Sequence, residues 1–280
     1  MQTLFRSAIV LSLLGACAAQ AATVTVTNVG NTPVANEWYR ANYRDVSTNT
    51  PASNPQITST TVAAITAINP NSGNASVQMS STNGTGKADF VYAWGYDPSR
   101  TLGTLSALGF EWYRATDTAA EHFAPAMRLL FDADGVEGGT DQAYLIWELT
   151  YQGPNGTNAA PRNTWIGSDL MTGDLYQRKF GPGGEIPAYN LTLADWAAGA
   201  QPANAFKLSA NTAILGIEFG IGSGWSNQFL GYVDNVSVGF NGDNTTFNFE
   251  LAPAAVPEPG SLALLGLGAL GLAARRRKQN

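Results

Sequence analysis

Residues 126–151 read AMRLLFDADGVEGGTDQAYLIWELTY, and this stretch decides the fold class. Its two apolar segments, residues 126–132 and 143–151, are rich in Leu, Ile, Phe, Tyr and Trp, a composition typical of β-strands. The intervening residues 133–140 are rich in glycine and contain an Asp-Gly pair, which favours a turn. The stretch therefore predicts a hairpin of two strands.

Similar strand signals recur on both sides of this hairpin. Residues 23–27 alternate with period two, and in residues 105–114 the alternation places Leu108, Phe110 and Trp112 on one side. Clusters of Asn, Gly, Ser and Pro separate the segments and predict turns. Further strands are expected at residues 57–67, 75–80, 88–95, 165–177, 212–221, 229–240 and 245–251.

Many short strands and few helices predict an all-β fold, an antiparallel β-sandwich of jelly-roll type. A β-barrel is the alternative, although the strands lack the evenly spaced amphipathic segments and aromatic girdles of an outer-membrane barrel. The one helix expected covers residues 192–198, with Thr192 or Asp195 as its cap. No internal repeat or break in composition divides the body, so residues 22–252 are expected to form one domain.

Residues 32–55 are poor in apolar side chains and are expected to form a loop. Trp38 and Tyr39 are the side chains in this stretch that could anchor it to a core.

The N-terminus has the features of a secretory signal peptide. Arg6 precedes an apolar run, residues 7–16, and Ala19-Gln20-Ala21 fits a signal-peptidase site. We therefore expect residues 1–21 to be removed by signal peptidase after passage through the Sec translocon. The alternative is lipidation, because Leu14-Gly15-Ala16-Cys17 is similar to a lipobox.

Removal of both ends changes the composition of the remaining body. Cys17 is the only cysteine, so the mature protein is expected to have no disulfide and no thiol chemistry. Without Arg6, Glu258 and the four cations near the C-terminus, 10 basic and 20 acidic residues are left, a net charge near −10. Such a surface repels nucleic acid, which is not expected to be a partner.

The C-terminus contains three segments in a fixed order. Val256-Pro257-Glu258-Pro259 is expected to be extended, because each proline restrains its own backbone and that of the preceding residue. Residues 262–274 are apolar but short, about 20 Å as a helix. A stable membrane span needs about 20 apolar residues, so the helix favours a temporary hold in the inner membrane. The basic cluster that stops transfer is Arg275, Arg276, Arg277 and Lys278.

These segments, residues 256–278, resemble the PEP-CTERM sorting signal of bacterial exported proteins. The resemblance implies recognition by an exosortase, a membrane-embedded enzyme similar to cysteine transpeptidases, in a diderm bacterium that makes extracellular polysaccharide. Residues 253–280 are therefore expected to be a sorting signal. The alternative is a plain C-terminal anchor.

Residues that could carry catalysis are few. His122 is the only histidine and is expected to lie in a loop, and no G-x-S-x-G motif is present. Paired carboxylates for glycoside hydrolysis could come from Glu111, Glu148 and Glu218. Each lies opposite apolar neighbours, however, so we expect all three on a solvent face and no enzymatic activity.

A cluster of aspartates lies in the predicted hairpin. Asp132, Asp134 and Asp141 could hold calcium, because clustered carboxylates beside glycines suit that ion. Their spacing does not match an EF-hand, and a plain turn is favoured. Neither a metal nor a cofactor is therefore expected.

Trp225 differs from the other tryptophans because Gly and Ser surround it. Such an indole could stack on a sugar ring, with Asn227 and Asp234 as polar neighbours, although packing as a loop anchor is the favoured interpretation. The body resembles the β-rich ectodomain of some PEP-CTERM proteins in residues 124–129, 144–148 and 222–236. Residues 233–236 (VDNV) also resemble the last strands of jelly-roll carbohydrate-binding modules.

These observations favour an exported, non-enzymatic protein of the cell surface or extracellular matrix, linked to exopolysaccharide and biofilm. A carbohydrate-binding module is the second hypothesis, and a secreted polysaccharide hydrolase is the third.

Overall fold

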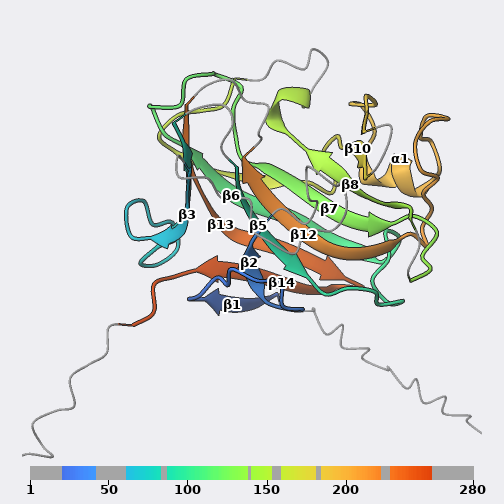
Figure 1. Ribbon diagram of the computed structural model, residues 1–280, viewed down its shortest axis with the longest axis horizontal. Coiled ribbons are helices and arrows are strands. Elements are labelled where there is room, and N and C mark those ends of the chain that lie inside the picture. The colour runs from blue at the N-terminus through green and yellow to red at the C-terminus, as the bar shows by residue number, and fades with distance from the viewer. Residues whose placement is uncertain are drawn as a thin grey trace, which may run out of the picture.

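The computed structural model describes residues 21–41, 61–82, 87–137, 140–152, 159–180, 184–221 and 228–253. Their strands form two seven-stranded sheets that pack face to face (Figure 1). This is the predicted β-sandwich. The N-terminal 1–20 and C-terminal 254–280, which include the predicted signal peptide and hydrophobic helix, lie outside the described residues.

The first sheet is built around one long strand, β13 (Phe229–Phe240). One edge of β13 pairs with β4 along residues 229–233 and with β14 along residues 236–240. The other edge pairs with β6. The strands of this sheet are β1 (Ala22–Val26), β3 (Thr61–Thr66), β4 (Ser76–Ser81), β6 (Leu105–Arg114), β9 (Trp165–Asp169), β13 and β14 (Asp243–Phe249).

The second sheet contains the hairpin that the opening stretch of sequence predicts. Its antiparallel order is β11-β10-β8-β7-β12-β5-β2, with β7 paired to β8 and β12. The strands are β2 (Trp38–Arg40), β5 (Ala88–Ala93), β7 (Ala126–Asp132), β8 (Gln142–Trp147), β10 (Tyr176–Lys179), β11 (Glu185–Ile186) and β12 (Ala213–Ile221). The second predicted strand of the hairpin is shorter than expected, because Leu149–Tyr151 form a 3₁₀ turn.

Aromatic side chains from both sheets form the core between them. Trp38 of the second sheet contacts Phe247 and Phe249 of the first, with ring centroids 5.4 and 5.2 Å apart. Phe110 on β6 meets Trp147 on β8 at 5.6 Å. Trp38 and Tyr39 thus anchor their segment as predicted, although they do so as a short strand.

One predicted strand is wrong. Residues 165–177 do not form a single strand but two, β9 in the first sheet and β10 in the second. The connection turns at Gly173, where an added Cβ would lie only 3.0 Å from the indole ring of Trp147. Leu170 and Leu175, on either side of this turn, are both buried.

The predicted helix is present as α1 (Leu193–Ala197), at the end of the sandwich near β10 (Figure 1). Thr192 and Asp195 form a reciprocal capping box, so both cap candidates take part. The helix positions Trp196, which is fully buried and donates its indole N–H to the carbonyl of Leu175 at 2.8 Å.

Candidate functional site

The sequence proposes three residues for sugar contact, and the structure describes only one of them. Trp225 and Asn227 lie outside the described residues. Asp234 lies on β13, where the pairing with β6 shifts between residues 234 and 237 and forms a β-bulge.

Asp234 is fully buried, and its carboxylate binds backbone amides. Oδ1 accepts N–H groups from Asn235 and Phe249 at 2.9 Å each, and Oδ2 accepts one from Ser72 at 3.4 Å. Burial raises the pKa of the Asp234 carboxyl, while these hydrogen bonds oppose the shift. Asp234 therefore fastens the 69–74 loop and the end of β14 to the bulge, and a sugar cannot reach it.

The same bulge turns Asn235 toward solvent. Asn235 adopts a φ of 47°, a left-handed conformation that asparagine tolerates better than most residues. Its Nδ2 donates to Glu111 Oε2 at 2.6 Å and to Ser72 Oγ at 2.7 Å. The amide of Asn71 also donates to Glu111 Oε2. Glu111, one of the three carboxylates that the sequence singles out, is thus held in a polar network.

This network borders a groove of ≈ 680 Å³ on the outer face of the first sheet. The floor consists of small residues, Ala107, Gly109 and Gly167. A Cβ at Gly109 would lie 2.7 Å from the carbonyl oxygen of Ser168, so glycine is required there. At Gly167 the nearest atom would be Glu111 Cγ, 4.0 Å away, so the space above it is open. The polar residues along the groove are Ser106, Glu111, Ser168, Asp169, Asn235, Ser237 and Thr246.

Three aromatic side chains occupy paired positions on β6, β9 and β13, on the same face of the sheet as the groove. Tyr113 pairs with Trp165 across β6 and β9, and with Tyr232 across β6 and β13. The ring centroid of Tyr113 lies 5.7 Å from each of the other two. Tyr113 and Trp165 are half-buried and so keep part of their rings accessible. We call the groove together with these three rings the aromatic–polar strip. From Ala107 to Tyr113 it is about 20 Å long, at roughly 3.4 Å per strand residue.

The second sheet carries a different cluster of polar residues on its outer face. Arg128 Nη1 lies 2.7 Å from Asp89 Oδ1 and 2.5 Å from Glu218 Oε1. Lys87 lies 3.1 Å from Asp89, and the Tyr144 hydroxyl donates to Glu218 Oε2 at 2.7 Å. Burial raises the pKa of Glu218 and lowers the pKa of Lys87. Two cations and two anions balance, and none of the four is more than 7% exposed.

The prediction that Glu218 faces solvent is therefore wrong. The face of the second sheet that points away from the first is itself buried and carries a second apolar cluster, which includes Leu130, Tyr144 and Ile146. The sequence did contain a signal for this burial, because Glu218 is the one charged residue in the otherwise apolar strand β12. A charge buried in such a strand needs partners.

The carboxylates considered for hydrolysis do not come together as a set. Glu111 lies on the outer face of the first sheet, whereas Glu218 lies on the opposite side of the sandwich. Glu148 follows β8 and accepts a hydrogen bond from the Tyr176 hydroxyl at 3.3 Å. His122 is exposed in a loop, as expected, with its ring against Phe123.

The described residues form an all-β sandwich with an open groove on the outer face of the first sheet. Comparison with known proteins adds information about the destination of the chain. Residues 255–278 match the PEP-CTERM protein-sorting motif. The motif implies export and exosortase-mediated, membrane-associated sorting to the cell surface. No curated protein matches the chain. Among the parts that the structure describes, no helix is long and apolar enough to cross a membrane.

Four solved chains match. One is a family 11 carbohydrate-binding module from Clostridium thermocellum in complex with a β-1,3-1,4-mixed-linked tetrasaccharide. It is 12% identical, the match covers 69% of this chain and 85% of that one, and the TM-score is 0.33.

Proposed function

We propose that this chain is a non-enzymatic protein of the cell surface or extracellular matrix, in a bacterium that makes exopolysaccharide and biofilm. The observation that carries the proposal is the match of residues 255–278 to the PEP-CTERM protein-sorting motif. Signal peptidase removes the N-terminal signal after Sec translocation. The C-terminal segment then holds the protein in the inner membrane until exosortase processes it.

The arrangement of the ectodomain supports a role without catalysis. Glu218 is neutralised inside an ion cluster, and Glu111 lies on the other side of the sandwich with its Oε2 bound to two asparagine amides. Glu218 and Glu111 therefore cannot together form the pair of carboxylates that glycoside hydrolysis needs.

Glu258→Ala tests the sorting route. In a host with the matching exosortase, the wild-type tail should be removed, whereas the variant should stay unprocessed in the inner membrane. Glu137→Ala is the matched control, because Glu137 is exposed in the β7–β8 turn and far from the tail in sequence. Equal processing of wild type and Glu258→Ala would contradict the role of the Pro-Glu-Pro segment.

A second candidate function, polysaccharide binding, is favoured by the aromatic–polar strip. An aromatic face offers apolar area to the C–H face of a sugar ring, and Glu111, Asp169 and Asn235 supply groups that can bind hydroxyls. Partly accessible rings next to an open polar groove are the combination that such a ligand needs.

Affinity electrophoresis in gels that contain the host's exopolysaccharide, or a glycan array, tests this candidate. Trp165→Ala should weaken binding at least tenfold, and Tyr189→Ala, a half-buried tyrosine outside this strip, should not. If Trp225→Ala abolishes binding and Trp165→Ala does not, the 222–227 segment is the site. If no polysaccharide retains the wild-type protein, polysaccharide binding is contradicted, and a role in the matrix would not depend on it.

A further inference from the structure

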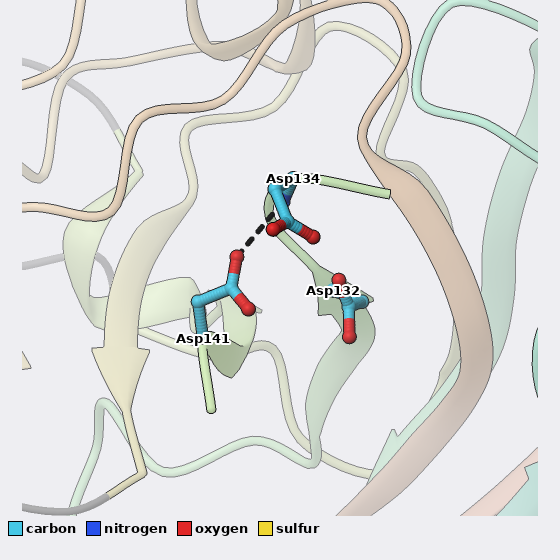
Figure 2. Close-up of side chains that lie close together, drawn as sticks. All are labelled: Asp132, Asp134 and Asp141. Carbon is cyan, nitrogen blue, oxygen red and sulfur yellow. Dashed lines mark hydrogen bonds between the residues drawn. The ribbon is translucent and has the colours of Figure 1, made fainter. Parts of the chain in front are cut away.

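The hairpin between β7 and β8 brings three aspartates together. Asp132 ends β7, Asp134 lies in the turn, and Asp141 directly precedes β8. One carboxylate oxygen from each lies within 4.8 Å of the other two. Figure 2 shows the three side chains arranged around a common space. No ion pair among the described residues supplies a cation to this cluster.

Asp132 differs from ordinary surface aspartates. It is only 1% exposed, and its Oδ1 accepts no hydrogen bond within the part of the chain that the structure describes. Burial, and then the charges of Asp141 and Asp134, raise the pKa of Asp132 to about 6. A buried carboxylate oxygen without a partner is unfavourable, so the position calls for an electropositive ligand.

The surrounding backbone is already fixed. Asp134 N–H donates to Asp141 Oδ2 at 2.8 Å, and Val136 N–H donates to Asp134 Oδ1 at 2.9 Å. The turn is also fastened to its neighbours, because the Tyr96 hydroxyl donates to the carbonyl of Gly135. A ligand at this site would thus meet carboxylates that are largely in place.

We propose that Asp132, Asp134 and Asp141 bind a calcium ion. Calcium takes six to eight oxygen ligands at about 2.3–2.6 Å, so opposite ligands lie roughly 5 Å apart. That separation accommodates the 4.8 Å spread of the three oxygens. Magnesium requires about 2.0–2.1 Å and near-octahedral geometry, a stricter arrangement than three carboxylates from one turn readily supply. Water and loop carbonyls can complete the calcium shell.

The sequence favours a plain turn here because the spacing is not that of an EF-hand. It could not show that Asp132 is buried with an unpartnered oxygen, and this observation changes the interpretation. Calcium would neutralise the cluster and fasten the β7–β8 turn.

Thermal unfolding of the exported protein tests the site. Extracellular calcium modules have dissociation constants of roughly 0.1–1 mM. Moving from EGTA to 10 mM CaCl₂ should therefore raise the Tm by at least about 3 °C. MgCl₂ at 10 mM should raise it by less than half as much. Asp134→Asn and Asp141→Asn should each abolish the calcium response. Asp243→Asn, which removes an exposed acid at the β13–β14 turn, should keep it.

Asp132→Asn separates a calcium ligand from a purely structural residue. In EGTA this variant should be at least as stable as wild type, because a neutral amide replaces a buried anion, yet it should gain nothing from calcium. A direct measurement uses Tb³⁺, whose luminescence Tyr96 should sensitise and CaCl₂ should quench. A wild-type protein with no calcium-dependent Tm and no Tb³⁺ emission would overturn the proposal. An equal response to Mg²⁺, or a full response in Asp134→Asn, would overturn it too.

Discussion

At the scale of the residue, burial and partners decide what each carboxylate does. Asp234 binds three backbone amides and fastens a bulge. Glu218 shares Arg128 with Asp89 inside a sheet. Glu111 borders an open groove. From the sequence all three look alike, because each is an acid in an alternating or apolar strand. The sequence predicts where the strands lie, but not which outer face is covered.

Glu218→Ala should lower the free energy of unfolding by about 3–5 kcal/mol, because Arg128 and Tyr144 would lose a buried partner. Equilibrium denaturation measures this effect. Glu137→Ala, at an exposed position, should change stability by no more than about 0.5 kcal/mol. A loss below about 1 kcal/mol for Glu218→Ala would show that the cluster is not needed.

The buried carboxyl group of Glu148 should make the stability of the protein depend on pH. Burial raises the pKa of its carboxyl in the folded protein above the ordinary value of 4.5. The native state then holds this proton more tightly than the unfolded chain. The stability that this provides is present below pH 4.5 and is lost as the pH rises through the folded pKa. Glu148→Gln removes it, so the stability of wild type relative to this variant should fall as the pH rises from 4 to 7. A constant difference across this range, measured by urea denaturation, would contradict the assignment.

At the scale of the element, the sequence is most informative where alternation and turn chemistry agree. The predicted bounds of β6, β7 and β13 match the structure, and so does the capped helix α1. The single strand predicted for residues 165–177 is wrong because the chain turns between β9 and β10, where Gly173 and Asp174 are residues that favour turns. The groove could not be predicted, because it depends on the register that aligns Glu111 with Gly167 and Tyr113 with Trp165.

Gly167→Leu tests whether the groove is a binding surface. Space above Gly167 is open, because a Cβ added there would lie 4.0 Å from its nearest neighbour, so the variant should fold with a Tm close to that of wild type. Its side chain should nevertheless fill the groove and weaken polysaccharide binding at least tenfold. Unchanged binding by a folded Gly167→Leu protein would place the ligand elsewhere.

Thr192→Ala tests how α1 is held. Loss of the capping box should cost about 1 kcal/mol. Thr172→Ala, at an exposed turn position, is the matched control. If both variants unfold at the same denaturant concentration as wild type, the cap does not stabilise the helix that positions Trp196.

At the scale of the whole molecule, we propose that the sandwich is the part that is delivered, and that the signal peptide expected at residues 1–21 and the sorting motif at residues 255–278 direct its delivery. Its core joins both sheets through Trp38, Phe247 and Phe249. A domain with such a core can be released without disulfide bonds. Cys17 should leave with the signal peptide, so N-terminal sequencing should begin at Ala22 or Thr23. A diacylglyceryl group on Cys17 would instead identify a lipoprotein.

The most direct test is the intact mass of the protein isolated from the surface or matrix of a host with the matching exosortase. We expect a chain that lacks residues 1–21 and has lost the apolar run and basic cluster at 262–280. A surface-exposed protein whose mass includes residues 262–280 intact would contradict it.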